Sequence, residues 1–212
     1  MLIDTAVKSL GTVPQKLIDE FANVCQQVDW SHEDFGRGNN LTIGSKVVRI
    51  PYGVRQDPYQ PDTPQVLMVR DAFKKIDQWA HTQLSDKIFV KGEINYMFPN
   101  SILDFHYDPC WFHEHGSRIH IPIFTNPQCH WLQGKEKTFM PVGHLYEVNN
   151  RVLHSFWNNG TTGRVHVVLD ILDKNLYNQA IEQNIVIDSF TIDPTITDPK
   201  NILDELLDQG KI

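Results

Sequence analysis

The sequence predicts a mainly β protein with flanking helices, built on a sandwich or a barrel. Two observations indicate this class. Between Ile88 and Leu172, six to eight short segments rich in β-branched and aromatic residues follow one another, separated by Gly, Pro and Asn. Two stretches with helical spacing of apolar residues precede them. The 212 residues, 41% of them hydrophobic and 21% charged, suffice for one sizeable core in a soluble globular protein.

The N-terminal part carries the two helical patterns. Pro14 favours a helix start, since its missing N–H costs nothing in a first turn. We expect the first helix over Thr12 to about Val28 and the second from Thr63-Pro64 to about Leu84, both supporting a sheet. Between them we expect a loop at Gly36–Asn40, a strand at Lys46–Ile50 and an irregular connection over Tyr52–Pro64.

The β region alternates in polarity. Ile119, Ile121 and Ile123 fall on one face of their segment and pack a core, so Arg118 and His120 on the other face can line a cavity. The expected strands are IFVKGEINYMF, SILDFHY, RIHIPIF, CHWLQ, KTFM, HLYEV, RVLHSFW and RVHVVLDIL.

Length and pattern predict a single domain over residues 1–212. Residues 1–87 form a helical and strand support, 88–172 the β core, and 173–212 a C-terminal extension. In the extension we expect a helix at Asn175–Asn184, turns at Ile192–Pro199 and a short helix at Asn201–Leu207.

Charge and composition exclude several classes of function. The net charge is −7 and no Lys/Arg run is present, which disfavours binding to nucleic acid or to an anionic membrane. No apolar run approaches a membrane span, and the N-terminus lacks the features of a signal peptide. The three cysteines form no CxxC pair and no even framework, as is typical of a cytoplasmic protein.

Three polar features lie in order within the β region. His106 and Asp108 are two residues apart, so in an extended strand both side chains point to the same face. His154 follows 46 residues after Asp108, and Arg164 ten residues after His154, both in strand-like segments. Two histidines and one carboxylate that leave coordination positions open form the facial arrangement of non-haem Fe(II) oxygenases.

The order HxD, H, R resembles that of the 2-oxoglutarate oxygenases, whose core is a double-stranded β-helix of the jelly-roll or cupin-like kind. The stretches "SILDFHYDP", "SRIHIPIF", "HLYEVNNRVLHSFWNNG" and "GRVHVVLDIL" most resemble the aspartyl/asparaginyl β-hydroxylase family, which also includes free-proline hydroxylases. The resemblance covers about residues 90–172.

The resemblance implies a role for each matched residue. His106, Asp108 and His154 would hold Fe(II), and Arg164 would bind the distal carboxylate of 2-oxoglutarate. Arg118 and His120 would help to hold this cosubstrate. The expected reaction consumes O₂ and 2-oxoglutarate, hydroxylates an amino acid or a peptidyl side chain, and yields succinate. Because a carboxylate occupies the third ligand position, the pattern argues against a halogenase.

Further residues are candidates for substrate contact. The segment Pro109–Ser117 follows the first two ligands and is expected to be a loop at the mouth of the pocket. Its HEH sequence lacks the spacing of the helical zinc-protease motif. His166, two residues after Arg164, shares its face. The candidates for substrate contact are Trp111, His113, His115 and, on another strand, His130.

Two other functions remain open at this point. One is a cupin-like metalloenzyme that does not use 2-oxoglutarate, in which Arg164 would have no obvious partner in the cavity. The other is a non-catalytic β-sandwich binding module, which would have to bury Asp108 and Arg164 without partners at a considerable cost. The expected partner is a small molecule or a peptidyl substrate, and the oligomeric state is left open.

Overall fold

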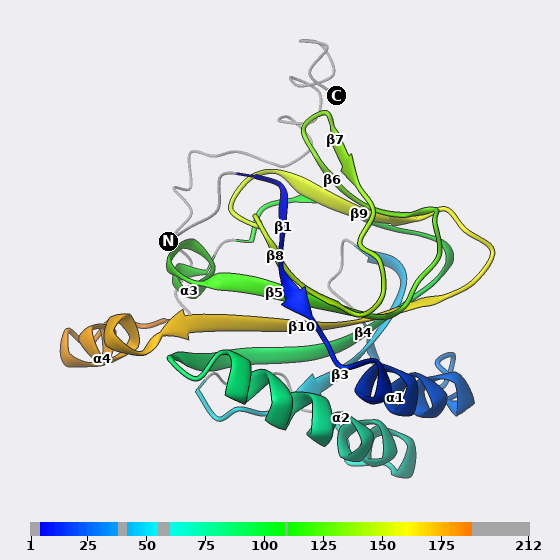
Figure 1. The fold of residues 1–212 in the computed structure, drawn as a ribbon, viewed down its shortest axis with the longest axis horizontal. Helices are drawn as coiled ribbons and strands as arrows, with labels where there is room; N and C mark the ends of the chain where they lie inside the picture. The colour runs from blue at the N-terminus through cyan, green and yellow to red at the C-terminus, as the bar shows by residue number, and fades with distance from the viewer. Residues whose placement is uncertain (1–4, 38–41, 55–59, 109, 188–212) are drawn as a thin grey trace.

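The computed structural model describes residues 5–37, 42–54, 60–108 and 110–187, and within them one strongly curved antiparallel sheet dominates (Figure 1). The sheet order is β1-β8-β5-β10-β4-β9-β6-β7, with β3 on β4 and β2 on β3. The strands are β1 (Val7–Thr12), β2 (Gly36–Arg37), β3 (Thr42–Ile50), β4 (Lys87–His106), β5 (Ser117–Phe124), β6 (Cys129–Gln133), β7 (Glu136–Thr138), β8 (His144–Val148), β9 (His154–Asn158) and β10 (Arg164–Asp173).

The predicted fold class is confirmed: the protein is mainly β, with a double-stranded β-helix core and flanking helices. One boundary differs from the prediction. The segments IFVKGEINYMF and SILDFHY, expected as two strands, form the single strand β4. Asn100 lies in β4 with a φ of 55°, a conformation that Asn tolerates better than most residues. The strand β4 therefore continues through Pro99-Asn100, a residue pair that normally ends a strand.

Three elements were missed by the sequence prediction, namely β1, α3 and β2. The N-terminal strand β1 pairs with β8, but almost all its residues are exposed, so it lacks an apolar face to reveal it. The five-residue helix α3 (Trp111–His115) lies where a loop was expected, and it is too short to show a helical period. The predicted loop at Gly36–Asn40 begins with β2, and its remainder lies outside the described residues.

Two helices, α1 (Gln15–Gln27) and α2 (Pro64–Gln83), confirm the two predicted ones. The Thr63 hydroxyl oxygen accepts a hydrogen bond from the Val66 backbone N–H and so caps α2. In Figure 1 both helices lie on the side of the sheet away from β6, β7 and β9. Helix α1 contacts β5 and α2 contacts β3, and their buried apolar side chains share one cluster with residues of β5 and β10, namely Ile119, Ile121, Ile123, Val165, Val167 and Leu169.

This packing decides which side chains enter the barrel. Because the isoleucines of β5 face the helices, Arg118 and His120 point to the opposite side. There a second apolar cluster lies between the two halves of the barrel, and it includes Met97, Trp131 and Phe156. Polar groups on this side are thus surrounded by apolar walls.

The C-terminal part adds one described helix, α4 (Lys174–Glu182), close to the predicted Asn175–Asn184. The predicted turns at Ile192–Pro199 and helix at Asn201–Leu207 lie outside the described residues. None of the helices in the described part of the chain is long and apolar enough to cross a membrane. The division of the chain at residues 87 and 172 stays a prediction.

Candidate metal centre

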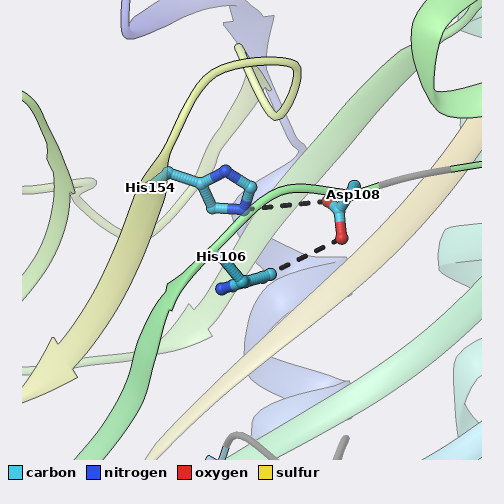
Figure 2. Close-up of side chains that lie close together, drawn as sticks. All are labelled: His106, Asp108 and His154. Carbon is cyan, nitrogen blue, oxygen red and sulfur yellow. Dashed lines mark ion pairs between the residues drawn. The ribbon is translucent and has the colours of Figure 1, made fainter. Parts of the chain in front are cut away.

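Two neighbouring strands bring the predicted ligands together. His106, the last residue of β4, pairs in register with His154, the first residue of β9, and their ring centroids are 4.3 Å apart. Asp108 lies two residues beyond His106 and turns back toward both rings (Figure 2). One potential ligand atom from each of the three residues lies within 4.8 Å of the others. The three side chains therefore converge on one point.

Backbone hydrogen bonds fix the orientation of both imidazoles. His106 Nδ1 lies 2.7 Å from the Asp104 carbonyl oxygen, and His154 Nδ1 lies 2.8 Å from that of Val152. Each Nδ1–H donates to its carbonyl, which leaves the Nε2 lone pair free. Both Nε2 atoms face Asp108, at 3.8 Å from Oδ1 for His106 and 3.7 Å from Oδ2 for His154.

The protonation states suit a divalent cation. Burial lowers the pKa of His154 to about 3 and lowers that of His106 as well, so both rings are neutral at neutral pH. Burial alone would raise the pKa of Asp108, but the positive charge of Arg118 beside it holds the pKa of this carboxyl well below its usual range. Two neutral nitrogens and one carboxylate are thus in the forms that ligate a metal.

The positively charged side chain of Arg164 is buried on the same side of the sheet as the triad. The Arg164 side chain is 3% exposed, and its guanidinium carbon lies 3.9 Å from the centre of the Phe156 ring. Its polar contacts to the backbone and side-chain oxygens of Asn95 are 3.4 and 3.5 Å long, and among the described residues its Nε has no hydrogen-bond partner. Within the described residues, no carboxylate lies within ion-pair distance of Arg164.

Burial lowers the pKa of Arg164 to about 9, so the guanidinium remains charged at neutral pH. Removing a charge from water without a counter-ion costs several kcal/mol. The arrangement therefore calls for an anion from outside the described chain, and a bidentate carboxylate fits a guanidinium best.

Aromatic rings connect the triad with Arg164. His154 and Phe156 are two residues apart on β9 and share a face, at a spacing of about 7 Å along the strand. Trp131 stacks on His154 with ring centroids 4.4 Å apart, and His120 lies 5.9 Å from Trp131 and 6.4 Å from Phe156. This series of ring contacts runs from the triad to Arg164, which packs on Phe156. The residues present fit both Fe(II) and 2-oxoglutarate.

His120 and His166 form a buried pair beside Arg164. Their Nδ1 atoms are 3.3 Å apart, so one donates and the other accepts, and His166 Nε2 has no partner. Burial, reinforced by the charge of Arg164, lowers the pKa of both imidazoles well below the usual value. The pair stays neutral in the folded protein.

This pair makes the stability of the folded protein depend on pH. Below the unfolded-state pKa of about 6.5 the unfolded chain binds protons that the folded chain does not, so the free energy of unfolding falls as pH decreases. Replacing His166 with glutamine should remove up to about 1.4 kcal/mol per pH unit of this slope. Denaturant unfolding at stepped pH values measures it, with the exposed His115→Gln as control. Equal slopes in wild type and His166→Gln would contradict the prediction.

The residues predicted to contact the substrate lie in several different parts of the structure. Trp111 and the exposed His115 contact each other on α3, with ring centroids 4.4 Å apart. His113 is buried, with Nε2 2.8 Å from an Arg118 nitrogen. His130 lies on β6 next to Phe139, on the opposite face from Trp131, which reaches the triad. Their roles in substrate binding stay predictions.

Two residues near the triad were missed by the sequence prediction. Asn150 Nδ2 donates a 3.1 Å hydrogen bond to Asp108 Oδ2. Asp170 is 2% exposed and pairs with Arg118. A carboxylate in the apolar strand RVHVVLDIL was a sign of a buried partner, but the strand pairing that supplies this partner is not visible in the sequence.

The comparison with known families fits this geometry. Residues 63–174 match the model of the aspartyl/asparaginyl β-hydroxylase family, which is more than half of the chain. The chain belongs to this family. It is therefore a 2-oxoglutarate-dependent hydroxylase, with Fe(II), 2-oxoglutarate and O₂ as its cofactor and cosubstrates. No curated protein matches the sequence significantly.

Solved structures resemble the fold at low sequence identity. A prolyl-4-hydroxylase from Pseudomonas putida has a TM-score of 0.51 at 13% identity, with 81% of this chain and 94% of that chain covered. AviO1 from Streptomyces viridochromogenes has a TM-score of 0.51 at 11% identity, with 80% and 90% covered. At these identities the likeness supports the shared fold alone.

Proposed function

We propose that this hydroxylase inserts one oxygen atom into a C–H bond of an amino acid or of a peptidyl amino-acid side chain. In the balanced reaction, the substrate, 2-oxoglutarate and O₂ give the hydroxylated substrate, succinate and CO₂. The observation that carries the proposal is the metal-competent triad together with the buried Arg164, which has no ion-pair partner among the residues that the structure describes. Fe(II) supplies the activation of O₂ when bound, a chemistry that side chains lack.

In this proposal each residue of the chain has a positioning task. His106, Asp108 and His154 would hold the metal, and three protein ligands leave further coordination positions for other ligands. Arg164 receives the distal carboxylate of 2-oxoglutarate, and this ion pair neutralises a charge that is otherwise buried alone. The predicted contact of His120 with the cosubstrate belongs to the same proposal, whereas the donors of Arg118, also predicted to contact the cosubstrate, are directed to Asp108 and Asp170.

The apolar walls around the site support it. Trp131 stacks on His154 and Phe156 lies against Arg164, so apolar rings flank both ends of the site and would limit the access of water to it. Excluding water also strengthens the ion pair at Arg164, because the local dielectric is low. The same residues would fix the chelated cosubstrate in a single orientation.

Free and peptidyl amino acids head the list of substrates to test. The family includes free-proline hydroxylases, and the Pseudomonas putida neighbour is described as a prolyl-4-hydroxylase. Proline, free and within short peptides, is therefore the first substrate class to try. We expect neither nucleic acid nor a membrane as partner, in line with the net charge of −7, and a cytoplasmic location.

The test is turnover of 2-oxoglutarate, measured as succinate, with Fe(II) and a panel of free amino acids and short peptides. We expect one substrate class to stimulate succinate formation and to gain one oxygen atom, seen as a mass increase. The His106→Ala variant provides the blank. Hydroxylation without succinate formation, or metal binding with no turnover of 2-oxoglutarate under any condition, would contradict the proposal.

A further inference from the structure

Arg118 lies between two carboxylates, one of which is the predicted ligand Asp108. Its Nε donates to Asp170 Oδ1 at 2.8 Å and one terminal nitrogen donates to Oδ2 at 3.1 Å, a bidentate pair. Its other terminal nitrogen donates to Asp108 Oδ2. Arg118 on β5 is paired in register with Asp170 on β10. The pairing of β5 with β10 therefore fixes the position of the guanidinium through its contact with Asp170.

The two side chains that donate hydrogen bonds to Asp108 both contact the same carboxylate oxygen. Arg118 and Asn150 both donate to Oδ2. Oδ1 receives neither of these hydrogen bonds and faces His106 Nε2 at 3.8 Å, while Oδ2 also faces His154 Nε2 at 3.7 Å. The two donors thus fix the carboxylate through Oδ2 and leave the lone pairs of Oδ1 for a metal. Such contacts behind a ligand orient it and tune the affinity of the site.

The negative charge of Asp170 determines how strongly Arg118 competes with a metal for the Asp108 carboxylate. A guanidinium whose only partner was Asp108 would cancel the ligand's charge and hold it away from a cation. With the buried Asp170 on its other edge, Arg118 is already neutralised and serves to orient Asp108. The three groups together carry one negative charge, which remains available to a divalent ion.

We propose that Arg118 and Asp170 form a positioning unit that presents Asp108 to the metal. This inference rests on the proposed function, because it takes Asp108 as a ligand. It differs from the expectation that Arg118 binds 2-oxoglutarate, since the donors described above are directed to protein carboxylates. The two roles predict different results when the binding of metal and of 2-oxoglutarate to variants is measured.

The test uses Ni(II) titration by calorimetry, without 2-oxoglutarate. Ni(II) is not oxidised by air and binds imidazole more strongly than Fe(II), so weakened variants stay measurable. Asp170→Asn and Arg118→Lys should each weaken Ni(II) binding about 10- to 100-fold. Lysine keeps the positive charge beside Asp170 and Asp108 but lacks the planar fork that holds both carboxylates in fixed directions, so this variant tests geometry with the local charge unchanged.

A double-mutant cycle separates positioning from a general effect on structure. In an Asp108→Ala background, Asp170→Asn should change Ni(II) affinity less than about twofold, because the group it positions is gone. Glu147→Gln is the matched control: this buried carboxylate on β8 accepts a hydrogen bond from Ser117. It should leave Ni(II) affinity unchanged.

The outcomes distinguish this inference from the proposed function. If the wild type binds no Ni(II), the proposed metal site itself fails. If the wild type binds and both variants bind equally well, while Arg118→Lys weakens only 2-oxoglutarate, the positioning unit is wrong. The same loss with and without Asp108 would also overturn it. Should Asp170→Asn not fold, Arg118→Lys with the same cycle decides.

Discussion

Replacing His154 with alanine is expected to weaken Ni(II) binding about a thousandfold. The ring supplies one of three donors, and its Nδ1–H bond to the Val152 carbonyl fixes the direction of its Nε2 lone pair. If a structural site gains roughly 10–16 kcal/mol from its ligands, one donor accounts for about 4 kcal/mol or about a thousandfold in affinity. Calorimetric Ni(II) titration of wild type and variant measures the loss.

The matched control for this variant is His130→Ala. His130 lies on β6, the neighbour of β9, but its side chain contacts Phe139 and not the triad. It should keep the wild-type affinity and one metal ion per chain. Retention of tight Ni(II) binding by His154→Ala would mean that the metal is held elsewhere, and the candidate centre would be wrong.

Replacing Arg164 with methionine should weaken the binding of 2-oxoglutarate and should stabilise the metal-free protein. Binding of 2-oxoglutarate to the Ni(II)-loaded protein should weaken at least about 100-fold, because a buried carboxylate loses its only charged partner. The metal-free protein, in contrast, should become more stable, since a buried charge without a counter-ion is replaced by an apolar side chain of similar length. A binding residue that costs stability is typical of a functional site.

Both halves of this prediction can be measured on the same preparations. Calorimetry gives the affinity for 2-oxoglutarate, and thermal unfolding of the metal-free protein gives the change in stability. Lys137→Met, which removes one positive charge from the exposed strand β7, controls for long-range electrostatics. Unchanged affinity for 2-oxoglutarate with Ni(II) still bound would refute the assignment of Arg164.

The strands and part of the site could be predicted from local pattern. Alternation of Ile119, Ile121 and Ile123 against polar neighbours assigned the faces of β5, and the structure confirms that these isoleucines pack against the helices. The spacing of His106 and Asp108 placed both on one face by strand geometry alone. Local periodicity sufficed for these features because they depend on neighbours in the chain.

The remaining features depend on contacts between distant segments. His154 lies opposite His106 only because β9 pairs with β4 in that register, and a family resemblance, not periodicity, predicted its partnership. Asp170 reaches Arg118 through the pairing of β10 with β5, across 52 residues of sequence. The number of possible pairings of ten strands is large, so such contacts cannot be derived from one sequence.

The most direct test of a triad beside Arg164 is an anaerobic titration of the protein with Fe(II) and 2-oxoglutarate, followed by visible absorption. We predict a weak charge-transfer band that saturates at one equivalent of Fe(II) and is lost in His154→Ala. Fe(II) bound to the wild type together with saturating 2-oxoglutarate, but without such a band, would contradict chelation at this site.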